Sequence, residues 1–85
     1  APSCHNISAM SDAIMRVGDI WCKDTRPIKG EFCHMFIVNI NREWSDWRNR
    51  EYFNIRYIML GGDEHYSIVF ERLDFTGSPY YKKVG

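Results

Sequence analysis

The chain has 85 residues, enough for one small domain but not for two, because domains usually contain about 100–150 residues. Hydrophobic residues make up 45% of the sequence and aromatic residues 15%, a composition that excludes intrinsic disorder. Eleven basic and eleven acidic residues give a net charge of zero, which argues against binding of DNA, and no apolar run reaches the ~20 residues of a membrane-spanning helix. We therefore expect a single domain over residues 1–85, without a membrane span.

The first residues point to secretion. The small residues Ala1-Pro2-Ser3 are typical of the start that remains after a signal peptide has been removed. Asn6-Ile7-Ser8 is an acceptor sequence for N-glycosylation, which has meaning in a secreted eukaryotic protein. Three cysteines allow one disulfide bridge and one thiol in an oxidising compartment. The sequence therefore predicts a secreted domain.

The first half of the chain predicts three strands. We expect a short strand near residues 5–7 and another within 13–22, where Gly18 marks a bulge or a close approach. A loop punctuated by proline and glycine follows over residues 24–30. Residues 31–41 are apolar on both faces, which is typical of a central strand that is covered on both sides.

The second half contains the clearest pattern. Residues 52–60 and 66–73 alternate between apolar and polar side chains, and Gly61-Gly62 lies between them, which predicts a β-hairpin. After a turn that contains glycine and proline, residues 80–84 form the last predicted strand.

Residues 42–50 depart from this pattern, because two tryptophans three positions apart stand among charged residues. A short helical turn and a connecting loop both fit. The fold class predicted from the sequence is therefore all-β: a small antiparallel β-sandwich or barrel of about six strands. Its core is expected to contain Phe32, Phe36, Val38, Phe53, Ile55, Tyr57, Ile68 and Phe70.

Histidine and cysteine are not spaced as zinc ligands. Only Cys4-His5 and Cys33-His34 are close in sequence, and neighbouring residues on a strand point to opposite faces. We therefore expect no metal and no cofactor.

A small secreted ribonuclease is the enzymatic alternative, since such chemistry needs a general acid, a general base and a cation for the phosphate. These residue types are supplied by His34, His65, Glu51, Glu71, Arg56 and Arg72. Their spacing is not diagnostic of a catalytic site, so we expect a non-enzymatic protein. Stacking of single-stranded RNA on a basic and aromatic patch is a further alternative.

Aromatic and basic residues gather at two places, one on each side of the predicted hairpin. Tryptophan, tyrosine and arginine dominate the hot spots of protein interfaces. The predicted binding residues are therefore Trp44, Trp47, Arg48, Arg50, Tyr80 and Tyr81.

The strand rhythm from Ile14 to Val84, the chain length and the few cysteines together resemble the MAX effectors, small six-stranded β-sandwiches that plant-pathogenic fungi secrete into host tissue. The resemblance implies a virulence protein that binds a host protein, in some cases by adding its edge strand to the sheet of an immune-receptor domain. We expect a monomer that engages its partner through a strand edge and aromatic side chains.

The resemblance also bears on the cysteines, because the disulfide of the family usually anchors the first strand. This role falls to Cys4, with Cys33 preferred over Cys22 as its partner. A bridge between Cys22 and Cys33 across a hairpin is the alternative.

Overall fold

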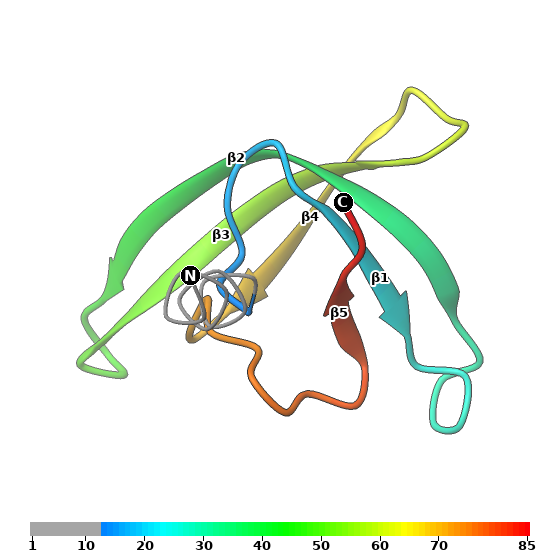
Figure 1. Cartoon of the computed structure of the whole chain (residues 1–85). Coiled ribbons are helices and arrows are strands. Elements are labelled where there is room, and N and C mark those ends of the chain that lie inside the picture. Colours follow the sequence, from blue (N-terminus) through cyan, green and yellow to red (C-terminus); the bar gives the residue numbers. More distant parts are fainter. Residues whose placement is uncertain (1–12) are drawn as a thin grey trace, which may run out of the picture.

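The computed structural model describes residues 13–85, and this part of the chain is all-β, as predicted. Five antiparallel strands form a single sheet in the order β4-β3-β2-β1-β5 (Figure 1). The strands are β1 (Ile20–Asp24), β2 (Phe32–Ser45), β3 (Arg50–Met59), β4 (His65–Phe70) and β5 (Tyr81–Lys83). The hairpin predicted around Gly61-Gly62 is confirmed as β3–β4.

The arrangement differs from the predicted six-stranded sandwich, since the described residues form one sheet rather than two facing sheets. The strand expected near residues 5–7 lies outside the described residues. Residues 42–50 form no helix. Strand β2 continues to Ser45, residues 46–49 make a turn, and β3 begins at Arg50. Asn49 has a φ of 53°, a left-handed conformation that asparagine tolerates better than most residues.

The sheet is strongly curved, and β2 and β3 form an arch above the rest of the chain (Figure 1). A bulge between Ile37 and Asn39 interrupts the pairing of β2 with β3, and bulges bend a strand and increase its twist. The segment of residues 71–80 (orange in Figure 1) runs below the arch from β4 to β5.

The core lies under the arch, on the concave face of the sheet. Its buried residues are Met15, Trp21, Met35, Ile37, Ile55 and Tyr57. The predicted core positions Ile55 and Tyr57 are confirmed, and the predicted Phe53, Ile68 and Phe70 are half-buried and pack against this cluster.

The core prediction is wrong for three residues of β2. Phe32 is 49% exposed, and Phe36 and Val38 are only half-buried. The buried side chains of this strand are instead Met35 and Ile37, which belong to the opposite face. A run that is apolar on both faces does not indicate which face turns inward, and the bulge at Val38 changes the alternation within the strand.

Phe75 closes the structure from below. Its ring centroid lies 5.3 Å from that of Trp21 on β1, 4.9 Å from that of Phe70 on β4 and 5.4 Å from that of Tyr81 on β5. The backbone holds this segment in place as well, because the Phe75 N–H donates to the Ala13 carbonyl (2.8 Å) and the Met15 N–H to the Leu73 carbonyl (2.9 Å). Residues 13–15 and 71–75 thus form a floor beneath the sheet.

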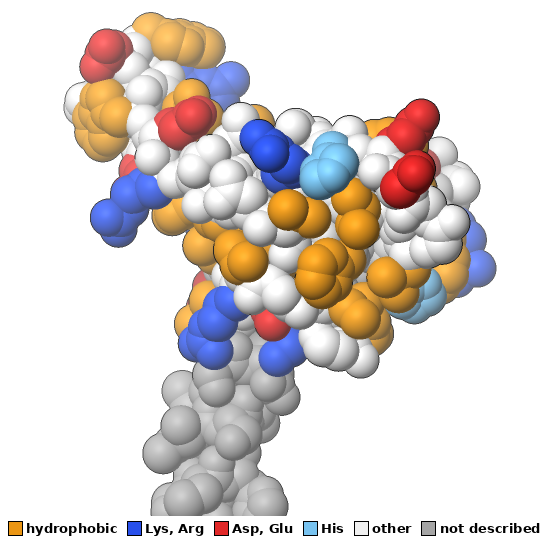
Figure 2. Space-filling model, turned by 90° about the horizontal axis from the view of Figure 1, so that it is seen from above, with side chains coloured by type: hydrophobic (Ala, Val, Ile, Leu, Met, Phe, Trp, Pro, Cys, Tyr) orange, Lys and Arg blue, Asp and Glu red, His pale blue; other side chains and the backbone are white. Residues whose placement is uncertain are grey.

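The convex face is partly apolar. The register places Ile20, Phe36 and Ile58 in one row across β1, β2 and β3, and His65 of β4 continues it. Figure 2 shows hydrophobic side chains gathered in the middle of this face, with basic, acidic and histidine side chains around them.

Candidate protein-binding site

The end of the β2–β3 hairpin carries the two exposed tryptophans. The last pairs of the ladder are Trp44 with Glu51 and Ser45 with Arg50, and Trp47 lies in the turn that follows. Trp44 is 59% exposed and Trp47 is 83% exposed, so neither indole belongs to the core. An exposed tryptophan at a hairpin turn is unusual, because tryptophans are highly buried on average.

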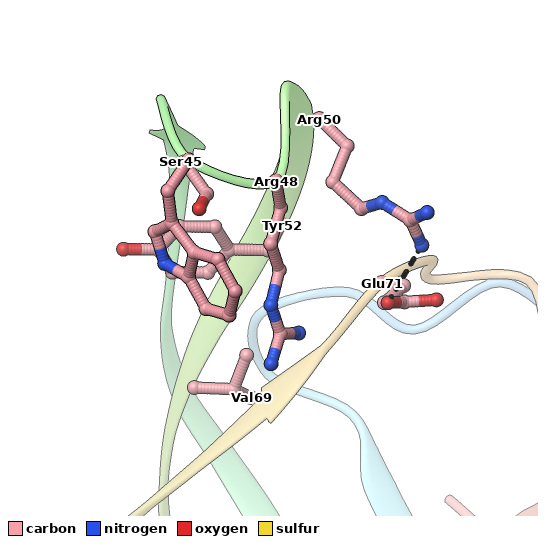
Figure 3. A pocket seen from close by; sticks show the side chains of 7 residues that line it. Ser45, Arg48, Arg50, Tyr52, Val69 and Glu71 are labelled. Atoms are coloured by element: carbon pink, nitrogen blue, oxygen red, sulfur yellow. Dashed lines mark hydrogen bonds and ion pairs between the residues drawn. The ribbon is translucent and has the colours of Figure 1, made fainter.

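A hollow of about 280 Å³ lies beside this turn. Its lining comes from the hairpin end and from the last part of β4, namely Ser45, Trp47, Arg48, Arg50, Tyr52, Val69 and Glu71. Figure 3 shows Arg48 extending from the turn toward Val69 of β4, and Tyr52 lying behind it. The hollow therefore exists only because β3 pairs with β4.

The polar groups of the hollow are held in place by several contacts. Arg50 Nη1 lies 2.9 Å from Glu71 Oε1, an ion pair that joins β3 to the residue after β4 (Figure 3). The Tyr52 phenol donates a hydrogen bond to Glu43, which raises the pKa of the phenol. The Arg48 guanidinium carbon lies 4.8 Å from the centroid of the Trp47 ring, a cation–π contact.

The charge in the hollow is unbalanced. Its lining contains two arginines and one glutamate, and that glutamate is paired with Arg50. Within residues 13–85, Arg48 forms no ion pair with a carboxylate. The arrangement presents a cation over an aromatic ring, next to apolar walls.

The predicted binding residues are only partly brought together. Trp47, Arg48 and Arg50 line the hollow, whereas Trp44 of the same hairpin does not. Tyr80 and Tyr81 lie at the opposite edge of the sheet, where the Tyr81 ring packs against the core cluster and its burial raises the pKa of the phenol.

Sequence reasoning did not assign Tyr52, Val69 and Glu71 to this site. Their proximity depends on the register of β3 against β4, in which Asn54 pairs with Val69. A local sequence pattern does not determine this register to within one residue. Tyr52 and Val69 stand at outward-facing positions of the alternating segments 52–60 and 66–73. This position is the sequence signal that could have assigned them to an exposed site.

The residues of the enzymatic alternative are spread over the sheet. His34 on β2 and His65 on β4 share the convex face, but β3 lies between their strands, which separates them by about 10 Å or more. Glu51 is ion-paired with Arg42, and Glu71 with Arg50. Residues 13–85 contain no cluster of three or more histidine, cysteine, aspartate or glutamate side chains able to hold a metal ion.

Cys22 and Cys33 are both free thiols in the structure. The register pairs Cys22 with His34 and Cys33 with Lys23, so the two thiols lie on opposite faces of adjacent strands. This geometry does not fit the alternative bridge between them. Cys4 lies outside the described residues, as do residues 1–3 and Asn6, so its disulfide, the secretion and the glycosylation stay predictions.

The described part of the chain contains no helix with the length and the apolar character needed to cross a bilayer. No known protein family matches this chain, and neither a curated protein nor a solved structure is significantly similar to it.

Proposed function

We propose that this chain is a non-enzymatic protein-binding domain that engages its partner through the β2–β3 hairpin end and the adjacent edge strand β4. The observation that carries the proposal is the placement of Trp47, which is 83% exposed beside Arg48 and an apolar hollow. An exposed aromatic ring with an arginine next to it is the composition of an interface hot spot.

The two sheet edges differ in a way that favours β4. Edge strands expose unpaired N–H and C=O groups, and lysine or proline on such a strand discourages pairing with another chain. Strand β5 has only three residues and carries Lys82 and Lys83, whereas β4 has six residues and neither lysine nor proline. The backbone of β4 pairs only with β3 among the described residues, so its other side is available for a partner strand.

The resemblance to MAX effectors supports a host protein as the partner and a role as a secreted virulence effector. An immune-receptor domain with an accessible sheet edge would suit β4, since the added strand supplies backbone hydrogen bonds and the hairpin supplies specificity.

Affinity capture from plant extract, followed by affinity measurement on the purified partner, tests this proposal. Trp47→Ala should weaken binding about 30-fold, the effect of losing a hot spot, and should leave the free energy of unfolding within about 0.5 kcal/mol of the original. Leu60→Ala is the matched control, because Leu60 is an exposed apolar residue of the β3–β4 turn, away from the hollow. Equal loss in both variants would contradict the proposal, as would RNA cleavage by the purified protein that His65→Ala abolishes.

A further inference from the structure

We propose that the hollow beside Trp47 binds a carboxylate carried on an apolar group, with Arg48 as its charge partner. In the cell this ligand would be an acidic side chain of the bound protein, so in that respect the inference rests on the proposed function. The site itself is defined by residues of this chain alone.

The walls of the hollow select an apolar group. Trp47 and Tyr52 contribute aromatic rings, and Val69 contributes a methyl-bearing surface from β4. A volume of about 280 Å³ lies below the range of about 300–1,000 Å³ that is usual for drug-sized ligands. The hollow thus has room for one inserted side chain.

The charge selects an anion. Glu71 compensates Arg50 at 2.9 Å, which leaves the Arg48 guanidinium as the uncompensated charge of the lining. The Arg48 guanidinium carbon lies 4.8 Å from the Trp47 ring centroid, and no carboxylate of residues 13–85 forms an ion pair with Arg48, so its guanidinium N–H groups remain available as donors. Two parallel N–H donors match the two oxygens of a carboxylate, which is the strongest form of this pair.

The position of the hollow fits a partner that pairs with β4. Val69 lies on the same side of the sheet as Ser67 and points into the hollow from this edge strand. Side chains of an added strand alternate between the two faces, so every second residue of that strand would lie on the side of Val69. An acidic residue at one of these positions reaches Arg48.

The test uses small probes in place of the partner. In ¹H–¹⁵N NMR spectra of the labelled protein, phenylacetate should shift the signals of the Trp47 indole N–H and the Arg48 Nε–H in a saturable way. Phenylacetamide, which has the same apolar group without the charge, should bind about fivefold more weakly or worse, as expected for the loss of one exposed ion pair. Inorganic phosphate, which has charge but no apolar group, should bind more weakly than phenylacetate.

Arg48→Gln should remove the preference for phenylacetate over phenylacetamide. Arg56→Gln is the matched control, because Arg56 is an exposed arginine of β3 that does not line the hollow. The inference is overturned if the amide binds as well as the acid, if phosphate binds as well as phenylacetate, or if the two variants behave alike. None of these outcomes changes the expected effect of Trp47→Ala on partner binding. A failure of the carboxylate-binding inference is therefore distinct from a failure of the proposed function.

Discussion

Phe70 and Tyr81 form a T-shaped aromatic contact with ring centroids 5.1 Å apart, although their strands are the two opposite edges of the sheet. A flat five-stranded sheet would keep its edge strands about 19 Å apart, since neighbouring strands are about 4.8 Å apart. The contact is possible only because the sheet curls round, and Phe75 touches both rings from below. The two edge strands of the curled sheet are therefore joined through aromatic side chains instead of backbone pairing.

Phe75 is the first target for a test of this arrangement. Phe75→Ala removes the ring that contacts Trp21, Phe70 and Tyr81, and should lower the free energy of unfolding by about 3 kcal/mol in a urea titration. Trp47→Ala, which removes a larger but exposed ring, should change it by no more than about 0.5 kcal/mol. Similar losses in both variants would show that the floor does not stabilise the sheet.

The two faces of β2 can be compared with adjacent residues. Ile37 is fully buried on the concave face, and Ile37→Ala should cost about 2–5 kcal/mol. Phe36 lies half-buried on the convex face, so Phe36→Ala should cost less, even though more atoms are removed. Thermal or urea unfolding of the two variants gives the order, and the reverse order would contradict the orientation of this strand.

The β3–β4 turn provides a test of backbone conformation. Gly61 has a φ of +89°, in the region that side chains disfavour, and no atom lies within 4 Å of the place a Cβ would take. Gly61→Ala should therefore destabilise the protein by about 1 kcal/mol through backbone strain alone. Gly62 has no such φ, and its nearest contact would be an ordinary 3.7 Å, which makes Gly62→Ala the control with the smaller effect. Differential scanning calorimetry of both variants should separate them.

Stability should decrease in acid. Hydrogen bonds from Arg26, Lys23 and Thr76 lower the pKa values of Asp24, Glu31 and Asp74, respectively, below their ordinary values of 3.8, 4.5 and 3.8. Because these carboxyls hold protons less tightly in the folded chain, their ionised forms favour folding. The contribution is complete above the ordinary values and is lost as the pH falls through the lower, folded-state values.

The midpoint of thermal unfolding should accordingly fall between about pH 5 and pH 2 at constant ionic strength. Asp74→Asn keeps one oxygen that can accept from Thr76 but no longer titrates, so the fall should be smaller in this variant. A midpoint that stays constant over this range would contradict the assignment.

The sequence was most informative for the β3–β4 hairpin, because its pattern is compatible with one structure only. Alternation in residues 52–60 and 66–73 and the glycines between them predicted the β3–β4 hairpin correctly, because a period of two on both sides of a glycine turn is specific to paired strands. In β2 the apolar residues on both faces left the orientation open, and the bulge then changed it within the strand.

The candidate site could be predicted in part for a similar reason. The composition around Trp47 indicated an exposed cluster, since arginine neighbours are rare in a core. The other half of the hollow depends on the pairing of β3 with β4, and the role of Phe75 depends on contacts with three separate strands. Contacts between residues that lie far apart in the sequence cannot be predicted from a local sequence pattern.

The floor beneath the arch also determines the order in which the parts of the chain should fold and unfold. Strands β2, β3 and β4 are neighbours in the chain, whereas Trp21 and Phe75 meet from near the two ends of the described residues. Closing a long loop costs entropy that local pairing does not, so the three-stranded meander should form first and the floor should dock after the folding transition state. Under this order, a change at Phe75 accelerates unfolding and leaves the folding rate nearly constant, which a chevron plot would record. The lifetime of the folded chain would then depend on one ring in a segment that lies outside the five strands.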